Sequence, residues 1–171
     1  IERAFDCFQQ MGETSSRNAK AEILETEKDN PVVKDILYRT YNPYWTYGVS
    51  SQTIPAAKAV ALSDYVVNFV AYKGLCTSLR ERTLTGNEAK RSLHLFFSGC
   101  TVEETKWYRA SLCKDLDIGI QSKTINSVIP DLIPSYDVML AAPWEEGKLE
   151  FPVYAEPKID GIRCLSAIDC T

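Results

Sequence analysis

The stretch ERAFDCFQQM, residues 2–11, places apolar side chains at Ala4, Phe5, Phe8 and Met11. These positions fall on one face of an α-helix, because about 3.6 residues make one turn. The side chains between them are mostly polar or charged. We therefore predict a helix that packs one face against a core.

Further segments along the chain have helix start signals or helical apolar spacing. Ser15 or Ser16 can cap one start, a proline suits the first turn of the next, and Thr101 and Glu104 are spaced as a capping box. We predict an all-helical domain over residues 1–130. Its further helices are TSSRNAKAEILE (14–25), NPVVKDILYRTY (30–41), YVVNFVAYKGLCTSL (65–79), LTGNEAKRSLHLFF (84–97), TVEETKWYRASLCKDL (101–116) and SKTINSVI (122–129).

The composition is that of an ordinary globular protein, with 171 residues of which 45% are hydrophobic. No apolar run approaches the roughly 20 residues that span a bilayer, and the first residues resemble no targeting peptide. The six cysteines lack C-x-x-C spacing, so we expect free thiols. Since His94 is the single histidine, we expect no zinc site of mixed ligands, and we assign no metal-ligating residues.

The net charge of −4 is unevenly distributed. Residues 1–129 carry 16 Lys and Arg against 15 Asp and Glu, whereas residues 130–171 carry 3 against 8. Within the first part, residues 73–91 have a local basic surplus. Such a surplus suits phosphate binding, although a solvated helix face explains it about as well.

The pattern changes near Pro130, and prolines, a glycine and acidic residues without helical spacing predict a linker over 131–150. FPVYAE (151–156) and IRCLSAID (162–169) are then predicted to be strands joined by a tight turn. An isolated hairpin is marginally stable in water. We therefore expect residues 151–171 to begin a second domain, so that the printed chain is truncated.

The turn holds Lys158, whose amine is a nucleophile only if its pKa is lowered from about 10.4. Arg163 can supply the positive charge that lowers it. Gly161 permits a close approach to a phosphate, and Asp160 can hydrogen-bond the turn amides. The alternative is a surface hairpin with an Asp-Gly turn, although K-x-D-G-x-R occurs by chance in only very roughly one chain in five hundred of this length.

K-I-D-G-I-R, residues 158–163, resembles the first motif of the nucleotidyltransferases that include ATP-dependent DNA ligases, RNA ligases and mRNA capping enzymes. The resemblance implies that Lys158 attacks the α-phosphate of ATP, with Mg²⁺ assisting, and becomes adenylated. It also implies that Glu156 contacts adenine and that Arg163 contacts the ribose and the nick, so Glu156, Lys158, Asp160 and Arg163 are the expected nucleotide-binding residues.

Longer stretches resemble the N-terminal part of the T-even bacteriophage DNA ligases. The resemblance implies an all-helical DNA-binding domain, followed by the first strands of an α/β, ATP-grasp-like adenylation domain. It further implies an ATP-dependent ligase that seals nicks in duplex DNA during replication, repair and recombination, in the host cytoplasm. The stretches are EILETEKDNPVVKDILYRTYNP (22–43), RTLTGNEA (82–89), KDLDIGIQSKTINSVIPDLIP (114–134), MLAA (139–142) and FPVYAEPKIDGIRC (151–164).

Two loops have the composition of phosphate-binding loops before helices, where free backbone amides and partial positive charge favour anions. The alternative is that Thr85, Asn87 and Ser122 only cap helices. The ligase resemblance favours DNA contact without sequence specificity. The expected DNA-binding residues are Arg82, Thr85, Gly86, Asn87 and Lys90 in the first loop, and Gly119, Gln121, Ser122, Lys123 and Thr124 in the second.

The aromatic segment TYNPYWTYG, residues 40–48, suggests either base stacking or packing on a helical core. We favour packing, because this stretch contains no basic groove. Alternative functions are an RNA ligase with the same hairpin chemistry, and a duplex-DNA-binding module without activity. The expected partner of the monomer is nicked double-stranded DNA. A polymerase sliding clamp is a further candidate, although the sequence has no clear clamp-binding peptide.

Overall fold

The computed structural model describes residues 1–55 and 65–135, where every regular element is a helix. The predicted helical fold is therefore confirmed for this part, while the predicted domain bounds stay predictions. The predicted strands of 151–171 and most of the predicted linker lie outside the described residues, so they stay predictions. The helices are α1 (Glu2–Glu13), α2 (Arg17–Thr26), α3 (Pro31–Tyr41), α4 (Tyr65–Arg80), α5 (Gly86–Ser98), α6 (Val102–Leu112) and α7 (Ser122–Val128).

Three helices begin at side chains that satisfy the free amides of the first turn. The Ser16 hydroxyl accepts from the backbone N–H of Ala19 at 3.4 Å. Asn30 caps α3 in the same way, and Pro31 stands in its first turn. Both hydrogen bonds of the capping box at Thr101 are present, which confirms the start predicted for α6.

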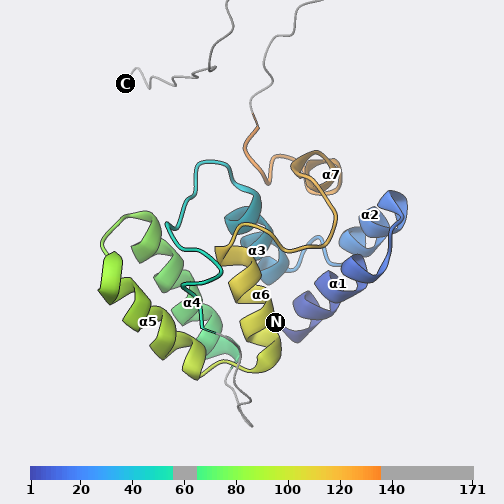
Figure 1. Ribbon diagram of the computed structural model, residues 1–171. Helices are drawn as coiled ribbons and strands as arrows, with labels where there is room; N and C mark the ends of the chain where they lie inside the picture. The colour runs from blue at the N-terminus through green and yellow to red at the C-terminus, as the bar shows by residue number, and fades with distance from the viewer. Residues whose placement is uncertain (56–64, 136–171) are drawn as a thin grey trace, which may run out of the picture. The chain divides into compact units, whose positions relative to one another are not determined.

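Helix α6 lies at the centre of the domain. It packs on α3 and α4, α4 packs on α5, and α1 and α7 both pack on α2. Figure 1 shows α1 and α2 on one side of α6 and α4 and α5 on the other. The core therefore forms where the faces of several helix pairs meet α6.

Aromatic rings carry this packing. Trp107 of α6 lies 5.5 Å from Phe8 of α1, measured between ring centres. Tyr108 of α6 lies 5.7 Å from Phe5 of α1, and its ring stacks on Tyr72 of α4 at 4.4 Å. All five side chains are at least 97% buried. The apolar face expected for residues 2–11 therefore packs on the aromatic residues of α6.

A buried group of hydroxyls joins α3, α4 and α6. Tyr72 donates its O–H to Ser111 Oγ at 2.6 Å, and the Thr40 hydroxyl lies 2.8 Å from the same oxygen. Tyr72 and Ser111 are both 0% exposed, and Thr40 is 1% exposed. Because a buried polar group costs free energy unless it is hydrogen-bonded, these contacts specify how the three helices meet.

The four cysteines in the described part are free thiols, as predicted for them. Cys7 and Cys76 are buried, and desolvation raises the pKa of each thiol to about 11. Both thiols therefore remain protonated at neutral pH. Because the thiolate is the reactive form of cysteine, we expect both to be unreactive. His94 is exposed on α5.

Candidate nucleic-acid interface

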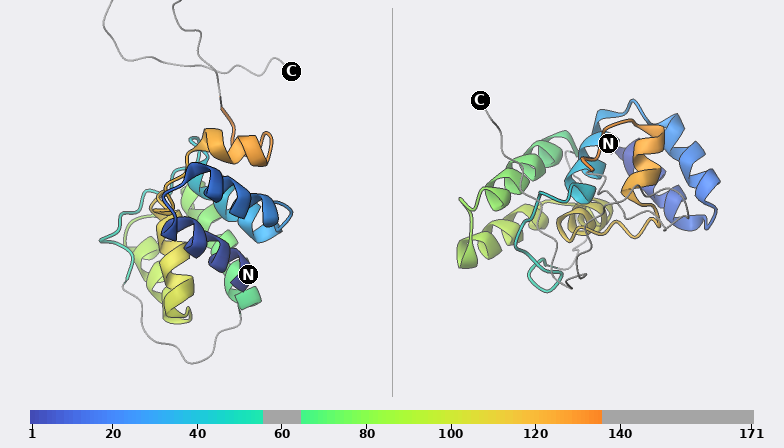
Figure 2. Two further views of the ribbon diagram at one scale, coloured as in Figure 1. Left: turned by 90° about the vertical axis from the view of Figure 1, so that its right-hand side faces the viewer. Right: turned by 90° about the horizontal axis from the view of Figure 1, so that it is seen from above.

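One end of the helical domain is formed by three connections that lie far apart in the sequence. They are residues 42–55, the α4–α5 turn and the segment from Cys113 to Gln121. Figure 1 shows the α4–α5 turn, the segment before α7 and the first part of residues 42–55 at the upper end, where α3, α4 and α6 finish and α5 begins. The rest of residues 42–55 runs down towards the lower end. Seen from above (Figure 2, right), residues 42–55 lie between the α4–α5 turn and α7. The two loops predicted to bind DNA are therefore at the same end.

The α4–α5 turn is held by short-range contacts to the last turn of α4. The backbone N–H of Leu84 and the hydroxyl of Thr83 both donate to the carbonyl of Ser78, at 3.2 and 3.1 Å. Arg82 has a φ of 61°, a left-handed conformation that is uncommon outside glycine. Gly86, with a φ of 56°, provides the second reversal before α5. The turn therefore has a defined shape.

The predicted contacts of this first loop are all on the surface. The predicted DNA contacts of this loop, all exposed, are Arg82, Thr85, Gly86, Asn87 and Lys90. The guanidinium of Arg82 lies beside Gly48, where an added Cβ would stand 2.2 Å from Arg82 Nη1. Arg82 thus extends from the turn across the neighbouring 42–55 connection.

The second loop is shaped by reversals and by a buried lysine. Asp117 and Gly119 have φ values of 52° and 62°. The N–H of Asp117 donates to the Asp115 carboxylate at 2.9 Å. Beneath the loop, Lys20 of α2 is 7% exposed and donates from Nζ to the carbonyl of Ile118 at 2.7 Å. The loop is therefore fixed to α2 before α7 begins.

Four of the predicted contacts in the second loop are at least partly accessible. Gly119, Gln121 and Lys123 are exposed, and Ser122 is half-buried. Thr124 is 5% exposed, so its side chain does not form part of the surface.

The alternative that Thr85, Asn87 and Ser122 only cap helices is wrong in this structure. Thr85 occupies the N-cap of α5 but makes no side-chain cap hydrogen bond. Asn87 lies one residue inside the helix that begins at Gly86. The N-cap of α7 is Gln121, which also makes no side-chain cap hydrogen bond. The amides that open α5 and α7 are therefore not satisfied by these side chains.

The aromatic segment packs on the helices, as predicted. Tyr47 is 3% exposed and donates its O–H to the carbonyl of Arg39 at 3.1 Å. The Trp45 ring lies 5.1 Å from the guanidinium of Arg39 and 4.4 Å from that of Arg80. Packing thus brings two guanidinium groups, one from α3 and one from α4, against the Trp45 ring.

Lys114 ties the third connection to the end of α3. Its Nζ donates to the carbonyls of Arg39 and Asn42, at 2.9 and 2.7 Å. A cation at this position also offsets the negative end of the α3 dipole. Burial lowers the pKa of the Lys114 amine to about 8.

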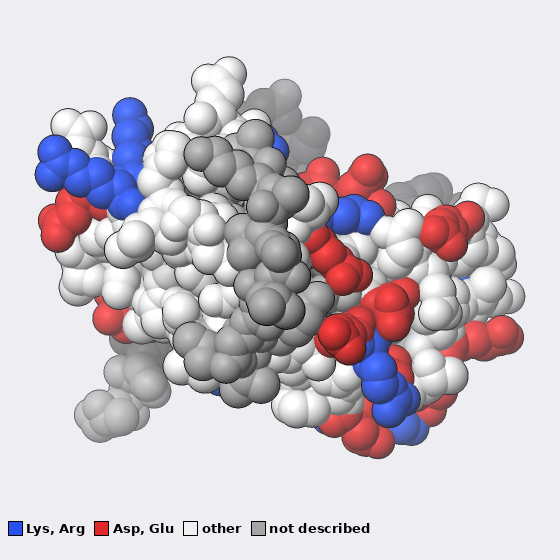
Figure 3. Space-filling model, turned by 90° about the horizontal axis from the view of Figure 1, so that it is seen from below, with Lys and Arg blue, Asp and Glu red and all other residues white. Residues whose placement is uncertain are grey.

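The opposite end of the domain is unsuited to a polyanion. Figure 3 shows acidic side chains gathered over one half of that face. Near the start of α6, the carboxyl pKa of Glu103 is raised by burial and by the negative charges of Asp6 and Glu2. Because DNA phosphates would be repelled there, the charge distribution favours the end that carries the two loops.

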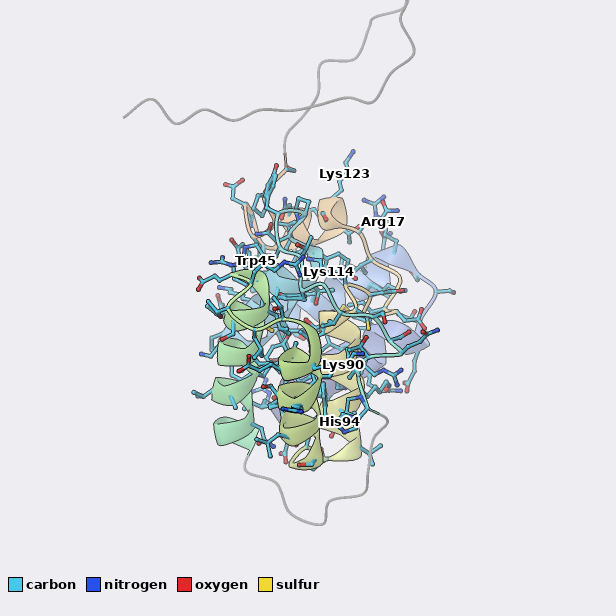
Figure 4. The ribbon with its side chains drawn as sticks, turned by 60° about the vertical axis from the view of Figure 1, so that its left-hand side comes forward. Arg17, Trp45, Lys90, His94, Lys114 and Lys123 are labelled. Carbon is cyan, nitrogen blue, oxygen red and sulfur yellow. The ribbon has the colours of Figure 1, made fainter. Side chains whose placement is uncertain are left out.

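Exposed cations flank the second loop. In Figure 4, Lys123 of α7 and Arg17 at the start of α2 project at the same end of the domain. Both side chains are exposed, and α2 packs on α7. Lys90 and His94 lie further down α5 in the same view. Exposed cations at this end of the domain therefore come from two different helices.

Sequence reasoning missed Lys20, Lys114 and Trp45 as parts of this end. For Lys20 a signal existed, because it stands one turn before Leu24 in α2, on the side of the helix that is buried. A lysine in the register of an apolar face is unusual. No local signal indicated Lys114, whose partners lie more than 70 residues earlier in the chain.

The expected nucleotide-binding residues Glu156, Lys158, Asp160 and Arg163 lie outside the described residues. Across residues 1–55 and 65–135, no three His, Cys, Asp or Glu side chains are placed to hold a metal ion. In the same part of the chain, no helix is both long and apolar enough to cross a membrane.

Comparison with known proteins identifies relatives. The chain is 28% identical over 162 residues, 90% of its length, to the DNA ligase of Enterobacteria phage T4. The DNA ligase of Enterobacteria phage T6 matches with the same identity and coverage. The chain is therefore similar to phage DNA ligases. This confirms the resemblance found in the sequence, and the chain spans about a third of the length of these ligases, 32% in each case.

Solved structures agree on the fold of this ligase-like chain. Pmar-Lig_PreS3 matches with a TM-score of 0.67 and 24% identity, over 73% of this chain and 29% of that one. Pmar-Lig_Pre matches with a TM-score of 0.66 and 25% identity over the same shares. No family model matches the chain.

Proposed function

We propose that this chain is part of an ATP-dependent DNA ligase that seals nicks in duplex DNA. The observation that carries the proposal is the similarity to the T4 and T6 phage DNA ligases over 90% of the chain. Residues 1–130 would bind the duplex, and residues 151–171 would begin the adenylation domain after the linker at 131–150.

In the proposed reaction, the Lys158 amine attacks the α-phosphorus of ATP and pyrophosphate leaves. The AMP then passes from Lys158 to the 5′-phosphate at the nick, and the 3′-hydroxyl displaces AMP to form the phosphodiester. Glu156 would contact adenine, Asp160 would shape the turn, and Arg163 would contact the ribose. Mg²⁺ is expected to accompany the nucleotide.

The loop-bearing end of the helical domain is the proposed DNA-binding surface. Most protein–DNA hydrogen bonds go to phosphate and sugar and carry no sequence information, which suits an enzyme that seals nicks anywhere. Surface exposure supports all the predicted contacts except Thr124, which we leave out. They are Arg82, Thr85, Gly86, Asn87, Lys90, Gly119, Gln121, Ser122 and Lys123.

The adenylation step is tested on the full-length enzyme with radiolabelled ATP. We expect one covalent adenylate per molecule, absent in Lys158→Ala. A Lys148→Ala variant, which removes another lysine upstream of the motif, should keep the label. Label retained by Lys158→Ala would exclude the mechanism.

An RNA ligase is the second candidate, because its family shares the hairpin chemistry. The relatives are named DNA ligases, which favours a DNA substrate. Competition between a nicked DNA duplex and broken RNA in one reaction would discriminate between them. If the protein is instead a binding module without activity, we expect no adenylation of the full-length protein. We further propose a monomer in the host cytoplasm, with a sliding clamp as a candidate partner in replication, repair and recombination.

A further inference from the structure

Lys20 is a buried cation whose partner is a backbone carbonyl. Its side chain is 7% exposed, and Nζ donates to Ile118 O at 2.7 Å. Among the ion pairs of residues 1–55 and 65–135, none includes Lys20. Burying a charge without a carboxylate partner is unfavourable, and a methionine of similar length would avoid that penalty. A lysine at this position therefore calls for a role other than filling space.

The hydrogen bond to Lys20 sets the direction of the next backbone amide. In a planar trans peptide, the C=O of one residue and the N–H of the next point in opposite directions. Because the Ile118 carbonyl points at Lys20 in the interior, the N–H of Gly119 points away from the interior. Gly119 is exposed, and within the described part of the chain its N–H donates no hydrogen bond.

Gly119 also allows a close approach to the backbone. Its φ of 62° suits glycine, and a Cβ added there would stand 2.4 Å from Lys20 Nζ. A side chain at this position would therefore displace the ammonium that orients the peptide.

Cations at this end of the domain favour an anion on this amide, although Asp115 and Asp117 stand in the same loop. The positive charge at Ile118 O polarises the peptide, which makes the N–H of Gly119 a stronger donor. Arg17 and Lys123 are exposed at the same end of the domain (Figure 4). Backbone N–H groups are frequent donors to DNA phosphate oxygens.

We propose that the backbone N–H of Gly119 donates a hydrogen bond to a phosphate of the bound duplex, and that Lys20 holds this amide in the required orientation from inside the protein. Lys20 is then a positioning residue that does not touch DNA. The inference rests on the proposed function, because the phosphate belongs to the DNA that this end binds.

The first experiment follows the Gly119 amide by ¹H–¹⁵N NMR while a nicked duplex is titrated into the full 171-residue chain. We expect its signal to shift on binding in the wild type. In Lys20→Met the shift should be lost and the affinity should fall about tenfold, which is typical of one hydrogen bond to a charged group. Lys28→Met is the matched control, because it removes the same charge from a surface lysine paired with Glu25. It should bind as the wild type does.

The second experiment distinguishes positioning from a general loss of structure. Nicked duplexes with one neutral methylphosphonate at successive positions are compared for binding. Replacing the phosphate that Gly119 contacts should weaken wild-type binding about tenfold, but should not weaken binding by Lys20→Met further. A purely structural effect of the substitution would leave the sensitivity to that phosphate unchanged.

Two outcomes would overturn the inference while leaving the proposed function intact. One is a wild-type chain that binds the duplex without any shift of the Gly119 amide. The other is a Lys20→Met variant that binds like the wild type and keeps the sensitivity to the same phosphate. If circular dichroism shows that Lys20→Met does not fold, the test rests on whether the Gly119 amide signal of the wild type shifts on binding. A wild-type chain that binds no duplex at all would instead contradict the proposed DNA-binding surface.

Discussion

The buried hydroxyls of Tyr72 and Ser111 provide a quantitative test of how α4 and α6 are held together. We expect Ser111→Ala to leave the Tyr72 O–H without the acceptor that lies 2.6 Å away, in a site with 0% exposure. An unsatisfied buried donor costs about 1–3 kcal/mol. Tyr72→Phe removes the donor itself, while Ser111 keeps its contact with Thr40 at 2.8 Å. That variant should lose about 0.5–1.5 kcal/mol, the net value of a typical hydrogen bond.

The double variant should be more stable than the sum of the two losses predicts. Once the Tyr72 hydroxyl is gone, Ser111→Ala no longer leaves that donor unsatisfied. We expect a coupling free energy of about 1–2 kcal/mol, within the range for residues in direct contact. The measurement is urea unfolding of the 171-residue chain, followed by far-UV circular dichroism, for the wild type, both single variants and the double variant.

Ser98→Ala is the matched control, because its hydroxyl bonds the exposed carbonyl of Leu95 at the end of α5. Its effect should add to that of Tyr72→Phe. The reasoning would be refuted if Ser111→Ala and Tyr72→Phe were also additive within about 0.3–0.5 kcal/mol, which is the usual limit for independent sites.

Other predictions concern helix starts, glycines and acid stability. Thr101→Ala should lower the unfolding free energy by about 1 kcal/mol in thermal melts, whereas Thr85→Ala, which removes no cap hydrogen bond, should barely change it. Gly48→Ala should destabilise by at least about 1–2 kcal/mol, because its φ is 63° and the added Cβ would meet an arginine. Gly74→Ala inside α4, with open space around it, should stabilise by about 0.5–1 kcal/mol in the same urea assay. A hydrogen bond from an asparagine side chain, followed by contacts with an arginine, lowers the Glu27 pKa below 4.5 despite burial. The stability that this carboxylate contributes is complete above that value and is lost as the pH falls through the lowered pKa. Glu27→Gln should therefore flatten the acid side of a plot of unfolding free energy against pH. An unchanged acid side would contradict the lowered pKa of Glu27.

Local patterns determined where the helices lie. The apolar spacing of residues 2–11 predicted α1, and the capping residues at Ser16 and Thr101 mark the starts of α2 and α6. These signals act over one or two helical turns, through hydrogen bonds and faces that neighbouring residues create. They can be recognised without knowing what the helix packs against.

The candidate site depended on contacts that no local pattern contains. Sequence reasoning selected the loops around Gly86 and Gly119, but only helix packing places them at one end of the domain. It also treated Thr85 as a possible cap, whereas the structure leaves that hydroxyl without a cap hydrogen bond.

The sequence by itself therefore determined an all-helical domain with two polar, glycine-containing loops, because the signals that start and stop helices come from residues close together in the sequence. The tertiary structure alone decided that Lys20 of α2 reaches Ile118 and that the guanidiniums of α3 and α4 flank Trp45. These partners are separated by tens of residues. Such contacts exist only after the apolar faces of the helices have packed around α6 and brought distant segments together.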